Sequence, residues 1–293
     1  MHVQAALARL LRPLDLTFGA ITYLLGTGVA RYLGASLDAN VIGFGLLIVE
    51  LAVLSLDMLA GAFATRTESY PEHSTLEERE TLRRAALNIS VAAVASVGLA
   101  GFAINSSRGL SAPALIYIGS LVLLAVLHSV PPTRLVDRGY GELLVAVQVA
   151  YLAPSLGFTL QSSIPHVLLT ICSVALSVLL IACLVAIDFS TFAADVKHGR
   201  STILTRLGWE KSLILHHMLI VAAYVFIASA VPLGFSIGLM APAFLAAPFA
   251  ALQVFLLQRL AAGAKPLWRL LTANAMAVFG LTAYFLTLSF WLR

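Results

Sequence analysis

Charged side chains are scarce in this chain of 293 residues. Asp, Glu, Lys and Arg make up 11% of it, whereas soluble globular proteins contain about 25%. Hydrophobic residues make up 60%, and the mean hydropathy is +0.95. A chain this apolar cannot cover its surface with polar groups. The composition therefore excludes a soluble globular protein and predicts an integral membrane protein with several spans.

Cysteines and basic clusters are also nearly absent. The two cysteines, Cys172 and Cys183, fall in one apolar run, where a helix would separate them by about 16 Å. This distance excludes a disulfide bond between them. The net charge of +4 comes from scattered Lys and Arg residues, so the pattern of a nucleic-acid-binding protein is excluded as well.

Long apolar segments fill the chain instead. A helix needs about 20 apolar residues to cross a bilayer. Nine segments meet this requirement, at roughly 14–34, 40–65, 85–106, 112–130, 141–161, 165–189, 212–232, 236–258 and 271–291. The N-terminus shows no cleavage pattern of a signal peptide and is expected to be mature sequence. The sequence predicts one all-α integral membrane domain over residues 1–293, with nine transmembrane helices.

Lys and Arg residues are distributed unevenly between the two sides of these spans. Fifteen of the 18 lie at the N-terminus or in the loops after even-numbered spans, and Arg31, Arg108 and Arg293 lie on the other side. Basic loops stay in the cytoplasm, so the N-terminus is expected to be cytoplasmic and the C-terminus on the opposite side. The two longest polar loops, 65–84 and 189–211, share the cytoplasmic side, where polar chemistry is therefore expected.

Two blocks on this side have a recognisable spacing. Residues 188–208 read DFSTFAADVKHGRSTILTRLG, and residues 130–146 read VPPTRLVDRGYGELLVA. The first fits the form D-x-x-x-D-x-x-x-G-[KR]-x-T-[LI] followed by Leu-Gly, with Asp195, Gly199, Arg200, Thr202, Ile203, Leu207 and Gly208 in register. The second fits Pro-Pro-x-Arg-Leu…Arg-Gly-x-Gly-Glu-Leu. Together the blocks resemble the UbiA superfamily of intramembrane prenyltransferases, in particular its naphthoate and other quinone-type branch.

This resemblance covers essentially the whole chain and implies both a fold and a reaction. The implied fold is a ring of nine helices around a central cavity that opens sideways to lipid. The implied reaction transfers a polyprenyl group from its diphosphate to an aromatic or other lipid acceptor. Two Asp-rich motifs at the ends of the second and sixth helices then hold Mg²⁺, because hard oxygen ligands suit Mg²⁺ and the metal neutralises the leaving diphosphate.

The sequence departs from the family pattern at the metal motifs. The first motif, N-D-x-x-D-x-x-x-D, aligns best with residues 58–68, where Ala60, Gly61 and Ala64 replace Asn and two Asp residues. Glu68 is the remaining carboxylate of that motif. In the second motif Thr191 replaces the first Asp, and Asp195 remains. Two carboxylates would hold Mg²⁺ weakly at best, so Mg²⁺ use is expected to be weak or absent.

Carboxylates one turn deeper in the same helices offer a shifted site. Asp57 precedes Gly61 by four residues, and Asp188 precedes Thr191 by three. Asp57, Asp188, Asp195 and Glu68 would then bind one metal or accept a proton, since ionisable residues inside a span are functional candidates. The alternative is that these carboxylates are solvated or pair within the bundle. Glu50, on the same helical face as Asp57, is a weaker candidate.

Other polar residues of the motif regions are interpreted as follows. Lys197 and Arg200 occupy the loop that meets the diphosphate in the family, and are either ligands or solvated charges. Arg134 and Arg138 are interpreted as topology anchors, Glu142 as a residue that fixes its loop, and His128 as interfacial.

Two functions stay open. The first is a prenyltransferase-like enzyme that acts on a polyprenyl diphosphate with an altered, carboxylate-poor metal site. The second is a catalytically silent member of the fold that binds an isoprenoid lipid or quinone as a carrier or as a subunit of a membrane complex.

Overall fold

The computed structural model describes residues 10, 12–64, 76–162 and 164–293. Within these ranges every regular element is helical, and no strand occurs. The elements are α2 (Pro13–Tyr32), α3 (Ala39–Ala62), α4 (Leu76–Arg108), α5 (Ala112–Ser129), η2 (Leu135–Arg138), α6 (Gly141–Ala146), η3 (Val147–Leu152), α7 (Ala153–Thr159), α8 (Val167–His198), α9 (Ile203–Leu207), α10 (Trp209–Ser229), α11 (Ile237–Met240), η4 (Ala241–Ala246), α12 (Ala247–Ala261) and α13 (Trp268–Trp291).

These elements form long passes that agree with the predicted spans. In the described part of the chain, eight helical segments are long and apolar enough to cross a membrane. The remaining predicted span corresponds to α2, which has 20 residues and carries Asp15 and Arg31 in its first and last turns. The prediction of a loop over 189–211 is wrong in its first half. Helix α8 continues to His198, and Gly199, with φ of 66°, ends it.

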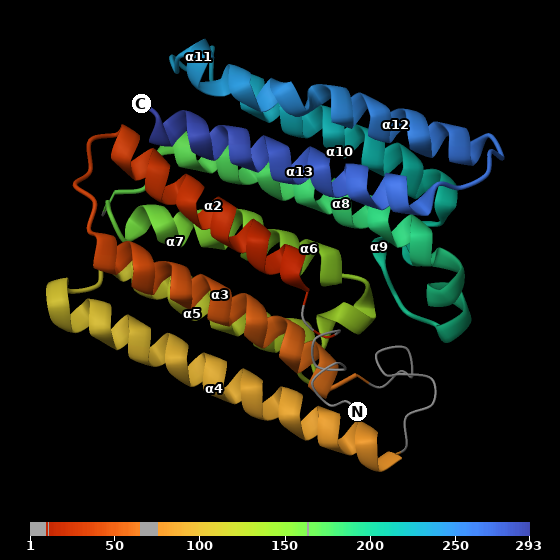
Figure 1. Ribbon diagram of the computed structural model, residues 1–293, viewed down its shortest axis with the longest axis horizontal. Coiled ribbons are helices and arrows are strands. Elements are labelled where there is room, and N and C mark those ends of the chain that lie inside the picture. The colour runs from red at the N-terminus through yellow and green to blue at the C-terminus, as the bar shows by residue number, and fades with distance from the viewer. Residues whose placement is uncertain (1–9, 11, 65–75, 163) are drawn as a thin grey trace.

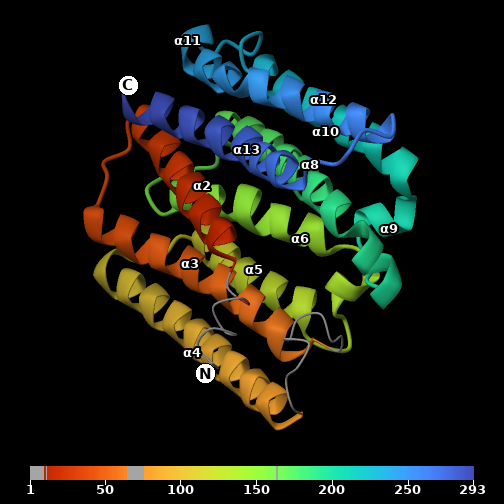
Figure 2. The ribbon, with the colours of Figure 1, turned by 45° about the vertical axis from the view of Figure 1, so that its right-hand side comes forward.

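The passes lie side by side with alternating direction (Figure 1), as short connections require. Helix α4 forms one edge, and α11 and α12 form the other, in both views (Figure 2). The pass made by α6, η3 and α7 is the most enclosed of the eight, and it packs against α2 and α8. This pass places its first turn, which carries Glu142, in the interior of the bundle.

Small residues allow α2 and α7 to approach closely. A Cβ at Gly26 would overlap the carbonyl of Pro154, and a Cβ at Gly157 would overlap the carbonyl of Tyr23. Such contacts are typical of membrane helices, where van der Waals packing holds the bundle together. Next to them, Thr22 Oγ1 donates a hydrogen bond of 2.5 Å to the Val149 carbonyl in the π-helical turn η3. The α2–α7 contact therefore fixes α2 against the central pass.

Candidate functional site

Both sequence blocks lie at one end of the bundle. Helices α2 and α6 begin there, and α3, α5 and α8 end there, on the right of Figure 1. We call this the motif end. It contains a cavity of about 420 Å³. The polar residues that line the cavity are Arg12, Asp15, His128, Glu142, Asp188, Thr191, Arg200, Ser201 and Thr202.

Three carboxyl groups in this cavity have an oxygen without a hydrogen-bond partner. The oxygens are Asp15 Oδ2, Glu142 Oε2 and Asp188 Oδ2. Their residues are only 7%, 8% and 8% exposed. Buried polar groups are nearly always satisfied, so three unpartnered oxygens on residues that line one cavity make this cavity the candidate site for a ligand that donates hydrogen bonds.

The two motif blocks are joined at the mouth of the cavity. Glu142 Oε1 accepts a hydrogen bond of 3.1 Å from the backbone N–H of Ile203, the first residue of α9. Arg206 donates to the Arg138 carbonyl over 2.9 Å and lies 4.9 Å from the ring centre of Tyr140. Arg134 Nε pairs with Asp137 Oδ2 at 2.9 Å. Glu142 therefore binds the start of α9 and also lines the cavity.

Asp195 is held by neighbours from its own block. The Thr191 hydroxyl donates to Asp195 Oδ2 over 2.7 Å, and Arg200 Nη1 lies 3.3 Å from Asp195 Oδ1. Asp195 is 2% exposed, so these two residues surround it on the side of the cavity. The carboxylate that matches the family motif is already neutralised within the chain.

Asp57, the shifted carboxylate of α3, contacts the segment before α2. Its Oδ2 accepts a hydrogen bond of 3.2 Å from the backbone N–H of Arg12. The Arg12 side chain keeps accessible surface because it faces the cavity. Burial alone would lower the pKa of the Arg12 guanidinium, but the carboxylates around it, Asp57 foremost, hold that pKa above its ordinary value.

The other predicted site residues lie elsewhere. Gly61 is buried, and a Cβ there would lie 2.8 Å from Leu10 Cδ1. Ala64 is buried and Ala60 is half-buried, while Glu68 lies outside the described residues. Lys197 is exposed in the last turn of α8 and does not line the cavity. Glu50 lines a different, apolar pocket between α2, α3 and α4.

Two charged residues of the cavity escaped the sequence interpretation. Arg12 was counted only as a basic residue of the N-terminus, and Asp15 was not considered. Their signal was an Arg-Pro-Leu-Asp run at the start of a span, which places two charges at a helix N-terminus. His128, which the sequence analysis places at the interface, is 3% exposed and lines the cavity beside Gly141, and its depth relative to the membrane stays a prediction.

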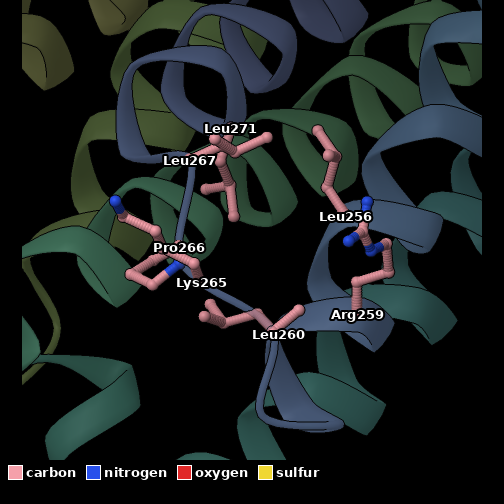
Figure 3. Close-up of a pocket in the computed structure, with 8 residues that line it drawn as sticks. Leu256, Arg259, Leu260, Lys265, Pro266, Leu267 and Leu271 are labelled. Atoms are coloured by element: carbon pink, nitrogen blue, oxygen red, sulfur yellow. The ribbon is translucent and has the colours of Figure 1, made fainter.

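A second hollow at this end of the bundle is too small to bind a ligand. It lies where α12 turns into α13 and is lined by Leu256, Leu260, Leu267 and Leu271, with Arg259 and Lys265 on opposite sides (Figure 3). Its volume of about 20 Å³ admits little more than one water molecule. The cavity lined by Asp15, Glu142 and Asp188, with its charged lining, is therefore the candidate site.

Solved structures share this architecture. A UbiA homologue from Archaeoglobus fulgidus, bound to GPP and Mg²⁺, superimposes with a TM-score of 0.70 over 99% of this chain and 100% of its own, at 17% identity. This chain has the UbiA fold. A structure reported for digeranylgeranylglyceryl phosphate synthase gives 0.60 at 15% identity, covering 100% and 98% of the two chains. A UbiA homologue from Aeropyrum pernix K1 gives 0.53 at 12% identity, covering 95% and 98%.

The resemblance seen in the sequence is thus confirmed at the level of the fold. No family model and no curated protein matches the sequence. The naphthoate branch stays a prediction, because the likeness of these structures does not specify a branch.

The site residues of this UbiA fold do not fit a pair of Mg²⁺ ions. In the described ranges, no group of three or more His, Cys, Asp or Glu side chains is placed to hold a metal. The first motif has lost its carboxylates at Gly61 and Ala64, and Asp195 is engaged by Arg200. Mg²⁺ is usually held by one or two carboxylates together with waters and phosphate oxygens, so a pair of ions needs carboxylates from both motifs, and the described part of the first motif no longer supplies them.

Proposed function

We propose that this protein binds an isoprenoid lipid and holds the polar head of that lipid in the cavity at the motif end. The observation that carries the proposal is a cavity lined by Arg12, Arg200 and three carboxyl residues, Asp15, Glu142 and Asp188, each of which has one buried oxygen without a hydrogen-bond partner. Such a site offers both donors and acceptors, with no large excess of one charge. A small cavity with a few convergent polar groups is the usual form of a ligand site.

The chemistry of the cavity favours an uncharged head. A diphosphate would face three carboxyl groups with two arginines, and the electrostatic balance opposes it. A quinone carbonyl would accept hydrogen bonds from the arginines, and a quinol or alcohol hydroxyl would donate to the carboxyl oxygens. Apolar residues such as Val145, Leu184 and Ile187 complete the wall and suit the first isoprene units of the tail. The proposed ligand is therefore an isoprenoid quinone, quinol or alcohol.

Prenyl transfer is the second candidate function. It is supported by the UbiA fold and by the unpartnered Asp188 Oδ2, which lies one turn deeper than the motif position Thr191 and is able to accept a proton from an acceptor hydroxyl. In this form the protein would transfer a polyprenyl group to a lipid or aromatic acceptor. The basic loops support an orientation in which the motif end faces the cytoplasm.

The first experiment identifies the lipid that co-purifies with the full chain. The protein is extracted in a mild detergent, delipidated by column washing, and the retained lipid is analysed by mass spectrometry. We expect an isoprenoid near one molecule per protein, and a several-fold loss of it in the variant Asp188→Asn. The variant Glu80→Gln removes an exposed carboxylate on α4 and serves as the matched control. Retention of no isoprenoid by the unaltered protein would contradict the proposal.

The second experiment separates the two functions. Binding of geranylgeranyl diphosphate to the protein in nanodiscs is measured with Mg²⁺ and with EDTA. Lipid carriage predicts weak binding that does not depend on Mg²⁺. Strong Mg²⁺-dependent binding, lost in Asp188→Asn but kept in Glu80→Gln, would instead establish the transferase form.

A further inference from the structure

Helix α3 carries an acidic residue half-way along its length. This helix is long and apolar enough to cross a membrane. Glu50 is the twelfth of its 24 residues, so about 17 Å of helix separate Glu50 from either end. A Glu side chain is too short to reach a membrane surface from there. Its carboxyl group therefore lies in the hydrocarbon region, where ionisable residues are rare and mark functional sites.

The side of α3 that carries Glu50 is turned to the outside of the bundle. Gly43, Leu47, Glu50 and Leu54 follow one another at intervals of three or four residues, so they share one side of the helix. Gly43 and Leu47 are exposed, and Glu50 and Leu54 are half-buried, whereas Ile48 on another side is fully buried. In a membrane-spanning helix an exposed apolar side meets lipid. A lipid-soluble molecule therefore reaches Glu50 without entering the motif end.

A pocket of about 340 Å³ lies on this side, between α2, α3 and α4. Glu50 is the polar member of its lining, which consists of Leu16, Leu47, Glu50, Leu51, Leu54, Met58 and Ile89. The pocket shares no lining residue with the cavity at the motif end. A concave, mostly apolar pocket of this size with a well-placed polar group is the usual form of a site for a small lipophilic ligand.

The carboxyl group of Glu50 has no partner in the described part of the chain. Its Oε1 is buried without a hydrogen bond, and no ion pair joins Glu50 to another described residue. A Cβ built at Gly19 of α2 would lie 3.5 Å from Oε1, so the bare backbone of α2 is the neighbour there. An unpaired carboxylate is very costly in hydrocarbon, which favours the neutral form, and this form both donates and accepts a hydrogen bond. The missing partner is therefore an uncharged polar group.

We propose that this Glu50 pocket is a second binding site, for an apolar lipid that carries an uncharged carbonyl or hydroxyl group at the depth of the membrane centre. The Glu50 O–H donates to a carbonyl, and the other carboxyl oxygen accepts from a hydroxyl. Phospholipids do not meet this requirement, because their polar groups stay near the membrane surface. A helix from a second copy of the chain is about 10 Å wide and would cover the pocket without filling it. This site is independent of the ligand proposed for the cavity at the motif end.

The test uses dicyclohexylcarbodiimide, an apolar reagent that modifies neutral carboxyl groups inside membranes. The full chain in nanodiscs of zwitterionic lipid is treated with the reagent, and modification of Glu50 is followed by mass spectrometry. Decylubiquinone supplies a carbonyl group, farnesol supplies a hydroxyl group, and hexadecane supplies neither. We expect Glu50 to be modified, and we expect decylubiquinone or farnesol, but not hexadecane, to slow the modification several-fold. The compound that protects Glu50 identifies the polar group that the site binds.

Two variants of α4 test whether the pocket is the route to Glu50. Ile89→Trp fills the pocket and should slow the modification several-fold. Leu87→Trp is the matched control, because Leu87 is exposed on α4 and does not line the pocket. The protection experiment itself needs no variant, so it does not depend on how these proteins fold.

Three results would overturn the inference. The first is an unmodified Glu50 in the unaltered protein, and the second is a modification that neither decylubiquinone nor farnesol slows. The third is a dimer in detergent that becomes monomeric in Glu50→Gln, because the carboxyl group would then contact a second copy of the chain.

Discussion

The backbone N–H of Ile203 donates a hydrogen bond of 3.1 Å to Glu142 Oε1, while the other oxygen of that carboxyl group is buried without a partner in a residue that lines the cavity. One side chain thus joins two sequence blocks that are 61 residues apart and faces the candidate ligand site. The hydrogen bond ties the start of α9 to the first turn of α6, beside the cavity.

We expect Glu142→Ala to destabilise the protein by about 1–3 kcal/mol, because the part-buried Ile203 N–H loses its acceptor. Glu142→Gln retains an acceptor oxygen and should cost less. Unfolding in detergent measures the stability, and amide exchange at Ile203 reports the hydrogen bond directly. Glu80→Ala breaks an exposed pair with Arg84 and should cost less than about 1 kcal/mol. Equal losses in Glu142→Ala and Glu80→Ala would contradict the assigned contact.

The contact between α2 and α7 predicts a strong effect of volume at Gly26. Gly26→Val would push a side chain into the Pro154 carbonyl, and we expect destabilisation of about 1–3 kcal/mol or more. Gly98→Val on α4 is the control, since no atom lies within 4 Å of the added Cβ there. Thermal unfolding of the two variants should separate them clearly. A Gly26→Val protein as stable as Gly98→Val would show that the two helices are farther apart than described.

The contact between Tyr140, at the start of α6, and Arg206 predicts that the stability of the protein depends on pH. The Arg206 side chain, through a hydrogen bond and through its charge, lowers the pKa of the Tyr140 phenol below its ordinary value of 10.0. The phenolate is thus favoured in the folded state, so the stabilisation is complete above pH 10 and is lost as the pH falls through the lower, folded-state pKa. In Arg206→Gln the pKa should return towards 10.0. Absorbance titration against Tyr140→Phe measures it, and an unchanged pKa in Arg206→Gln would refute the pairing.

The spans could be predicted from the sequence because each depends only on local hydropathy. Helices α5 (Ala112–Ser129) and α13 (Trp268–Trp291) lie within a few residues of their expected ranges. The extension of α8 to His198 could not be predicted from hydropathy. Polar residues continue a helix where the elements packed against that helix support it. Tertiary context overrides local composition there.

The candidate site was predicted only in part, for a geometric reason. Asp188 was singled out as a metal ligand of a shifted site; it lines the cavity, and its role as a ligand stays a prediction. Glu50 and Asp57 share a helical face, but seven residues of helix separate them by about 10 Å, so one faces an apolar pocket and the other contacts Arg12. The position of Arg12 depends on how α2 packs between α3 and α8, which no local pattern encodes.

Restoring a carboxylate of the first motif is expected to cost stability. In Gly61→Asp the new Cβ would lie 2.8 Å from Leu10 Cδ1, so the backbone or Leu10 must move before the carboxylate can point anywhere. We expect a loss of about 1–3 kcal/mol in stability from this overpacking. Ala60→Asn restores the neighbouring motif residue at a half-buried position and should cost less. Unfolding in nanodiscs compares the two. Mn²⁺ binding should stay absent in both, because one restored residue does not complete a group of carboxylates placed to hold a metal among the described residues. A stable Gly61→Asp protein that binds Mn²⁺ would mean instead that the missing carboxylate alone prevents metal binding.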